Sequence, residues 1–368
     1  MSRSPIHTSI CDLFGVEHPI VQTGMGWVSG ARLTAATSAA GGLGILASAT
    51  MTLDELERAI ADVRSRTDKP FGVNLRGDAP DLEQRLDLIT AGSVRVASFA
   101  GAPSKQAIAR LKSRGVLTMP TVGAKRHAEK MAEWGVDALI AQGHEGGGHT
   151  GPVPTTLLLP QVCDAVKIPV LGAGGFFDGR GLIAALAYGA SGIAMGTRFL
   201  LTRESTVPMD VKKVYLQTQV TGTIVTKSID GVPQRVIKTK LIDALEARGA
   251  IGALFSALKH AWQFRGLTGT SPLALLKEGL AMKSGGELSW SQLAMAANAP
   301  MLTRSSMVDG RTDVGILPTG QNVGVIDELP TVAELVARIV REAEDTLARL
   351  PSVKRVSAKP TEETRAQR

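Results

Sequence analysis

A glycine-rich loop that ends in a histidine is the stretch of this sequence with the clearest potential for chemistry. Residues 142–151 read Q-G-H-E-G-G-G-H-T-G and follow an apolar run, 136–141, that predicts a buried strand. The glycines at 146–148 allow the backbone to lie flat against a planar ligand. His149 closes the loop, and histidine has an ordinary pKa close to neutrality. The arrangement is typical of a cofactor-dependent oxidoreductase in which His149 gives or takes a proton.

Two later apolar runs also end in glycines. The run 168–171 leads into Gly172-Ala173-Gly174-Gly175, and the run 193–195 leads into Gly196-Thr197. Backbone N–H groups in such turns bind phosphate, and the last two strand ends are the usual phosphate site of an eight-stranded α/β barrel. These two turns therefore predict the phosphate end of a mononucleotide.

Polar side chains at other strand ends could bind the ring of that mononucleotide. Asn74 and Gln142 each offer an amide donor and acceptor, which is the mixed pattern at the pyrimidine edge of an isoalloxazine. Met25 could lay its backbone or thioether against the ring. Loop capping by the two amides, and core packing by Met25, remain alternatives. His144 and His149 match no zinc spacing, so no metal is predicted, and Glu145 could simply orient the loop.

The elements that position these residues follow a regular alternation. Eight short apolar runs alternate with helical segments, which predicts a closed (β/α)8 TIM-type barrel; the alternative is a doubly wound sheet. No G-x-G-x-x-G follows the first run, which disfavours that alternative. The predicted strands are 19–22, 43–46, 70–74, 94–98, 116–119, 136–141, 168–171 and 193–195. The predicted helices are 31–40, 53–66, 82–90, 105–114, 125–134 and 331–350, with Thr52 and Glu55 forming a capping box.

The alternation ends near Pro208, which predicts a division of the chain. Residues 1–208 are expected to form the barrel, and 209–308 a smaller, mainly helical domain that covers the substrate. Residues 309–350 are expected to be a loop and a helix packing back on the barrel, and 351–368 a disordered tail. The segment from Lys212 to Lys240 is rich in basic residues against the single acid Asp230. It is either a solvated surface or a site for the phosphates of a coenzyme A thioester.

Composition limits the setting and the partners. The chain has 368 residues, 44% of them hydrophobic, and a formal net charge of +7. Cys11 and Cys163 suggest no disulfide framework, and the N-terminus has no apolar signal core, so a cytoplasmic protein is expected. The uncharged stretch 33–53 is better explained by a helix, a turn and a strand than by a membrane span. Basic and aromatic residues are not interleaved, so no nucleic acid is expected. A homo-oligomer is left open.

Four stretches together resemble the nitronate monooxygenase family, also called 2-nitropropane dioxygenase-like. They are Q-T-G-M-G at 22–26, Q-G-H-E-G-G-G-H at 142–149, G-G-F-F-D-G at 174–179 and M-G-T-R-F at 195–199. The resemblance implies an FMN-binding barrel with a smaller helical domain closing over the flavin, and it places His149 on the catalytic histidine. The expected cofactor-binding residues are Gln22, Thr23, Gly24, Met25, Gly26, Asn74, Gln142, Gly147, Gly148, Gly174, Gly175, Gly196 and Thr197.

A narrower resemblance concerns the reaction. The segments 21–28, 147–153 and 155–160, together with W-S-Q at 290–292 and M-A-A-N at 295–298, are similar to an actinobacterial subgroup that degrades the steroid C and D rings. That subgroup implies carbon–carbon oxidoreduction of an indane-carboxyl coenzyme A thioester. Gly147 stands where the superfamily often has alanine, which would leave more room above the flavin. Nitronate oxidation with O2, enoyl-thioester reduction and non-catalytic flavin binding are the alternatives. NAD(P)H could enter only transiently, since no second dinucleotide motif is present.

Overall fold

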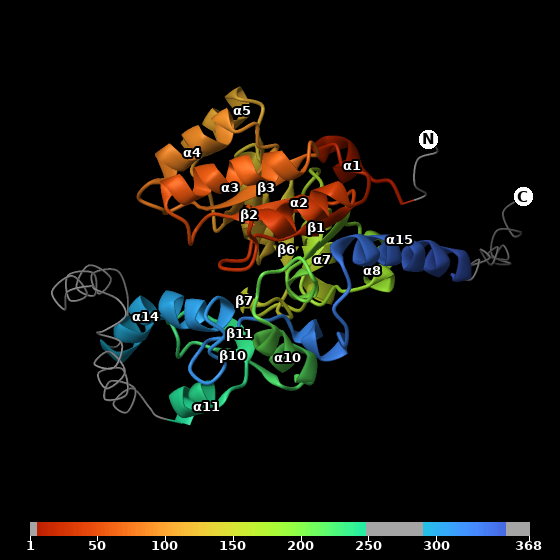
Figure 1. Ribbon diagram of the computed structural model, residues 1–368. Coiled ribbons are helices and arrows are strands. Elements are labelled where there is room, and N and C mark those ends of the chain that lie inside the picture. Colours follow the sequence, from red (N-terminus) through yellow and green to blue (C-terminus); the bar gives the residue numbers. More distant parts are fainter. Residues whose placement is uncertain (1–5, 248–289, 351–368) are drawn as a thin grey trace, which may run out of the picture.

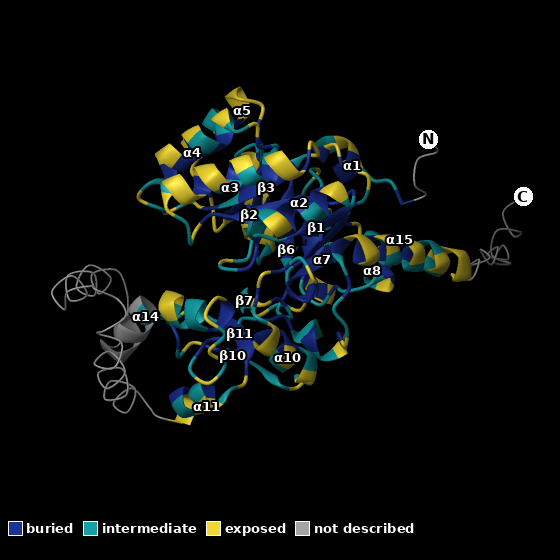
Figure 2. Ribbon diagram, viewed as in Figure 1, coloured by how far each residue is buried: buried dark blue, intermediate teal, exposed yellow. Residues whose placement is uncertain are grey.

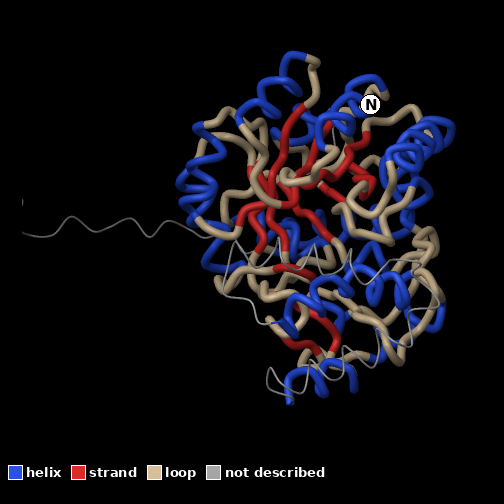
Figure 3. Tube along the Cα trace, turned by 90° about the vertical axis from the view of Figure 1, so that its left-hand side faces the viewer, coloured by secondary structure: helices blue, strands red, loops and turns tan. Residues whose placement is uncertain are grey.

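Eight parallel strands form a closed barrel in this computed structural model, which describes residues 6–247 and 290–350, with side chains after 247 described from Asn298. The strand order is β1-β2-β3-β4-β5-β6-β8-β9, and the barrel occupies the upper part of Figures 1 and 3. The barrel strands are β1 Ile20–Gln22, β2 Leu43–Ala47, β3 Phe71–Arg76, β4 Val96–Ala100, β5 Leu117–Val122, β6 Leu139–Gln142, β8 Val170–Ala173 and β9 Gly192–Met195. The predicted (β/α)8 barrel is therefore confirmed.

Helices follow the barrel strands and cover them on the outside. Those preceding residue 208 are α1 Ser9–Phe14, α2 Ala31–Ala39, α3 Leu53–Arg66, α4 Leu82–Ala91, α5 Lys105–Ser113, α6 Lys125–Glu133, α7 Thr155–Ala165, α8 Gly179–Ala187 and α9 Thr197–Leu200. The predicted capping box is present: the Glu55 N–H donates to Thr52 Oγ1 at 3.2 Å, and the Glu55 carboxylate accepts from the Thr52 N–H at 2.8 Å. Residues 33–53 form parts of α2 and α3 and all of β2, and no helix in the described part of the chain is long and apolar enough to span a bilayer.

Several strands begin later than predicted because the valine before them belongs to the end of a helix. The Val116 N–H donates to the Leu111 carbonyl, and the Val136 N–H donates to the Met131 carbonyl. The preceding glycines are left-handed, with φ of 72° at Gly115 and 84° at Gly135. An apolar residue after a left-handed glycine packs back on the helix that it ends. Strand β5 therefore starts at Leu117 and β6 at Leu139.

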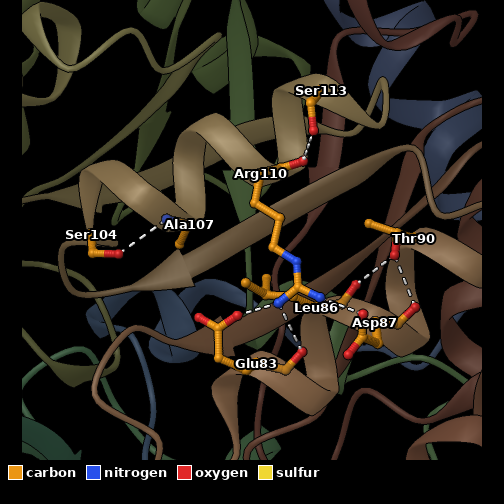
Figure 4. A network of polar contacts seen from close by, with 8 residues as sticks. All are labelled: Glu83, Leu86, Asp87, Thr90, Ser104, Ala107, Arg110 and Ser113. Atoms are coloured by element: carbon orange, nitrogen blue, oxygen red, sulfur yellow. Dashed lines mark hydrogen bonds and ion pairs between the residues drawn. The ribbon is translucent and has the colours of Figure 1, made fainter.

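The core lies on both faces of the barrel strands, as expected where helices cover a parallel sheet. All five residues of β2 are buried, and Figure 2 shows the strands dark beneath helices whose outer faces are exposed. An ion-pair network lies on two of these outer faces. Arg110 on α5 contacts the carboxylates of Glu83 and Asp87 on α4 (Figure 4). The pairs are exposed, so they connect the two helices but contribute little to stability.

Residues 209–308, called the second region here, contain strands that the sequence analysis missed. The elements described are α10 Met209–Gln217, β10 Thr223–Thr226, β11 Gln234–Ile237, α11 Lys240–Ala247 and α14 Trp290–Met307. A short strand from the barrel side, β7 Gly148–His149, completes a three-stranded sheet of order β10-β11-β7. The second region therefore joins the barrel through the histidine loop (Figure 1). Its boundaries remain a prediction.

The C-terminal part returns to the barrel. After the short helix η1 Gln321–Val325, helix α15 Val332–Arg349 lies beside α8 (Figure 1). Gly179 on α8 makes the close approach possible, because a Cβ there would lie 2.3 Å from the backbone nitrogen of Ala343. A second capping box, of Thr331 and Glu334, begins α15. The predicted disordered tail, 351–368, lies outside the described residues.

Candidate active site

The predicted site residues meet at the carboxyl ends of the barrel strands. A Cβ at Gly24 would lie 2.4 Å from the Cβ of Asn74, so the loop after β1 touches the end of β3. A Cβ at Gly196 would lie 3.2 Å from Thr23 Oγ1 and 3.3 Å from the sulfur of Met25, so the same loop touches the turn after β9. The barrel thus brings residues far apart in sequence into one mouth, as the (β/α)8 fold requires.

Gln22 lies in the wall of this mouth. Its side chain is fully buried, and Nε2 donates to Ser29 Oγ at 2.9 Å and to the Ile45 carbonyl at 3.1 Å. The Ser29 hydroxyl also accepts from the Met25 N–H at 3.0 Å. The Gln22 amide nitrogen therefore holds the loop that carries Thr23 to Gly26, while Oε1 is buried and has no hydrogen-bond partner among the described residues. Asn74 Nδ2 donates to Ser98 Oγ at 3.3 Å.

The histidine loop, residues 143–149, is held from both ends. Gln142 Nε2 donates to the carbonyl of His149 at 2.7 Å. The Glu145 carboxylate accepts from the backbone N–H of Thr155 at 2.9 Å and from its hydroxyl at 2.7 Å. That contact caps the first turn of α7, so Glu145 orients the loop. His144 Nδ1 lies 2.9 Å from the carbonyl of Gly151. No cluster of potential metal ligands occurs among the described residues.

His149 has a partner that sequence reasoning did not identify. Its Nε2 lies 2.7 Å from Oδ2 of Asp230, in the loop between β10 and β11. The His149 side chain is 60% exposed and the Asp230 side chain 20%. Burial raises the pKa of Asp230, but hydrogen bonding and the charge of His149 outweigh it and leave that pKa below its ordinary value. The one available signal was that Asp230 is the single acid of a basic stretch.

A second missed group is the closing segment, residues 318–322. The Gly320 N–H donates to Thr197 Oγ1 at 2.8 Å, and the Gln321 N–H donates to the Glu145 carbonyl at 2.9 Å. Asn322 Nδ2 donates to the Phe176 carbonyl at 2.9 Å. The closing segment therefore ties together the loops after β6, β8 and β9. Neither its residue types nor its place after the second region indicated this role.

Basic side chains of the second region divide into two groups. Lys212 is buried, and its Nζ donates to the carbonyls of Thr202 and Ser205 at 2.7 and 2.8 Å. Arg235 is also buried and donates to the carbonyl of His144 at 3.1 Å. Burial lowers the pKa of both groups. These two residues hold the fold, while other basic residues of the stretch, such as Lys227 and Lys240, are exposed.

The family model described as nitronate monooxygenase matches residues 7–87 and 81–342. The chain belongs to the nitronate monooxygenase family. It is an FMN-dependent oxidoreductase of that family, as the sequence predicted.

Individual relatives extend over nearly the whole chain. Two curated proteins, from Rhodococcus jostii and Mycobacterium tuberculosis, are each 56% identical to it over 92% of this chain and 96% of their own. Both are named (3aS,4S,5R,7aS)-5-hydroxy-7a-methyl-1-oxo-octahydro-1H-indene-4-carboxyl-CoA dehydrogenase. Among solved structures, FabK from Thermotoga maritima is 32% identical with a TM-score of 0.76, covering 94% of this chain and 98% of that one.

The mouth has backbone donors that suit the family's cofactor. The N–H groups of Gly175, Gly196 and Thr197 have no acceptor among the described residues, and three free N–H donors on adjacent turns suit a phosphate. At Gly148, a Cβ would meet no atom within 4 Å, so the loop leaves open space beside it. The residues present therefore fit a flavin mononucleotide.

Proposed function

We propose that this protein is an FMN-dependent oxidoreductase of an acyl-CoA, of the indane-carboxyl type derived from the steroid C and D rings. The observation that carries the proposal is the 56% identity, over 92% of the chain, to two dehydrogenases named for such a thioester. The mouth supports it, because the loop that carries His149 approaches the turn after β8, where a Cβ at Gly174 would lie 3.0 Å from the nitrogen of Gly146.

The cofactor would be held by three groups of residues. Gly174, Gly175, Gly196 and Thr197 would bind the phosphate through their backbone N–H groups. The loop of Gln22, Thr23, Gly24, Met25 and Gly26 would lie along the ring with Asn74 and Gln142. Gly147 and Gly148 would let the histidine loop approach the ring closely, since they carry no side chain.

The chain's own residues would handle the proton. The flavin, when bound, supplies hydride transfer to or from a carbon near the thioester carbonyl. His149 would give or take the matching proton, and the histidine loop and the closing segment would keep water from the reacting carbons. Exposed Lys227 and Lys240 would meet the phosphates of coenzyme A. NAD(P)H as a transient electron partner and a cytoplasmic location remain predictions, and the oligomeric state stays open.

Oxidation of an alkyl nitronate by O2 is the second candidate, because the matching family model bears that activity in its name. The two candidates separate in one set of assays. The purified protein with bound FMN is mixed with propionate 3-nitronate and O2, with the saturated indane-carboxyl-CoA, and with an enoyl-CoA plus NADH or NADPH. We expect the flavin absorbance to bleach with the saturated thioester. Rapid oxygen uptake with nitronate alone, without response to any thioester, would contradict the proposal.

A further inference from the structure

We propose that Asp230 is a positioning residue that fixes the proton of the His149 ring on Nε2 and so leaves Nδ1 as the nitrogen that exchanges a proton with the substrate. This inference rests on the proposed function. It adds a residue from the second region to a site whose other predicted residues all come from the barrel.

The contact itself determines which nitrogen carries the proton. An ionised carboxylate only accepts hydrogen bonds, so at 2.7 Å the Nε2 atom of His149 must be the donor. The lowered pKa of Asp230 keeps that carboxylate ionised at neutral pH. Within the described part of the chain, Nδ1 of His149 has no hydrogen-bond partner. The neutral ring therefore presents Nδ1 as a free base.

The carboxylate is itself held in place. Oδ1 of Asp230 accepts from the Val232 N–H at 3.1 Å, and hydrogen bonding to the side chain of Gln234 also lowers its pKa. Oδ2 is the oxygen that contacts His149. Gln234 lies directly opposite His149 in the antiparallel pairing of β11 with β7. The imidazole thus lies on one strand of this small sheet, and the acid lies in the loop that joins the other two strands, where the Val232 N–H holds it.

This arrangement suits proton transfer at a carbon atom. In the oxidising direction, the proton of one substrate C–H bond goes to Nδ1. The electron pair of that bond would form the carbon–carbon π bond, and the flavin, when bound, would supply the acceptor for a hydride from the neighbouring carbon. The ring then carries a positive charge close to the Asp230 carboxylate, which stabilises it. In the reducing direction the same proton returns from Nδ1 to carbon.

The first test reads the tautomer directly and needs no turnover. The FMN-loaded protein is labelled with 15N-histidine, and its ring signals are recorded by long-range 1H–15N correlation at a pH where the ring is neutral. The His149 signal is identified by its loss in His149→Gln. We expect the Nε2–H tautomer in the wild type and a mixture of tautomers in Asp230→Asn. An Nδ1–H tautomer in the wild type, or an unchanged ring signal in Asp230→Asn, would overturn the inference.

The second test is a double-mutant cycle on the loaded enzyme. We expect His149→Ala to keep its flavin and to lower turnover by roughly 10²–10⁴, the usual worth of a general acid or base. Asp230→Asn should lower kcat by roughly 10–100-fold, as for other residues that orient a functional histidine, with little change in KM. In the double variant, Asp230→Asn should lower kcat no further than His149→Ala does alone, because the effect of Asp230 is exerted through the His149 ring. Asp210→Asn, an exposed carboxylate paired with Lys213, is the matched control and should leave activity unchanged.

The outcomes separate the inference from the proposed function. Turnover that survives His149→Ala overturns the acid–base role of His149 and with it the inference, whereas a flavin that responds to no thioester overturns the proposed function. Turnover that falls in His149→Ala but not in Asp230→Asn overturns the inference alone. An Asp230→Asn loss that is just as large without the imidazole identifies a structural role for Asp230 and also overturns the inference. Flavin absorbance and thermal unfolding of Asp230→Asn verify that the variant folds.

Discussion

At Gly147 the lack of a side chain decides how closely two backbone segments approach. A Cβ there would lie 2.5 Å from the carbonyl carbon of Thr319 and 2.6 Å from the nitrogen of Gly320. Both are backbone atoms, which cannot turn aside as the end of a flexible side chain can. The sequence suggested that this glycine makes room above the flavin, and the structure adds that it lets the closing segment reach the histidine loop.

Gly147→Ala should therefore displace the closing segment. We expect the free energy of unfolding to fall by about 1–3 kcal/mol, the usual cost of overpacking, and FMN to be held more weakly. Urea denaturation and flavin titration measure the two effects. Gly123→Ala is the matched control, since its Cβ would meet only the Gln142 carbonyl at 4.0 Å. Equal behaviour of the two variants would show that the close approach at Gly147 is not a constraint.

At this scale, residues that are far apart along the chain could not be paired from the sequence. The histidine loop and the glycine turns could be predicted from the local sequence, because each directly follows its own strand. Asp230 is 81 residues away from His149, and its role depends on a strand pairing that no local pattern encodes. The role of the closing segment was not predicted for the same reason, since its partners lie on three different barrel loops.

Among the elements, the contact of α8 with α15 depends on one small residue. A Cβ at Gly179 would lie 2.3 Å from the nitrogen of Ala343 and 2.4 Å from the carbonyl oxygen of Ile339. We expect Gly179→Ala to push the two helices apart and lower the free energy of unfolding by about 1–3 kcal/mol. Chemical denaturation checks this.

The neighbouring glycine in α8 serves as its control. A Cβ at Gly181 would meet the ring of Phe176 at 3.2 Å, and a ring can shift more easily than a backbone. Alanine is also the better helix former, so Gly181→Ala should change stability little. If both variants lost the same stability, the close helix contact would not be the cause.

The barrel elements were predictable because their signals are local and repeated. Apolar runs, helix caps and helix-ending glycines each occupy a few adjacent residues, and eight repeats indicate a closed ring. β10 and β11 were missed because each has only four residues, and the third strand of their sheet, β7, has two. Such short strands are stabilised by pairing with their neighbours. Their own sequence hardly differs from that of a loop.

At the scale of the molecule, several carboxylates have lowered pKa values because they are hydrogen-bonded in the fold. Hydrogen bonds from Arg85 lower the pKa of Asp81, and those from Arg76 lower that of Asp78. Capping-box contacts do the same for Glu55 and Glu334. A lowered carboxyl pKa stabilises the fold above the unfolded-state value, about 4, and that stabilisation is lost as pH falls through the folded-state value.

The protein should therefore lose stability in acid. We expect the urea midpoint to stay level near neutral pH and to fall steadily below about pH 4, where carboxylates of the unfolded chain bind protons first. Denaturation curves between pH 7 and pH 3 measure this. Asp81→Asn should flatten part of the decline. A midpoint that rises on acidification would contradict the assignment.

The pairing of β7 with β11 links His149 to the second region. His149, the proposed acid–base group, belongs to one strand of a sheet whose other two strands lie outside the barrel. A barrel truncated after residue 208 would keep the glycine turns after β8 and β9. It would lose Asp230, the hydrogen-bond partner of His149. Changes in the second region that admit a different thioester would therefore also alter the proposed acid–base chemistry of His149.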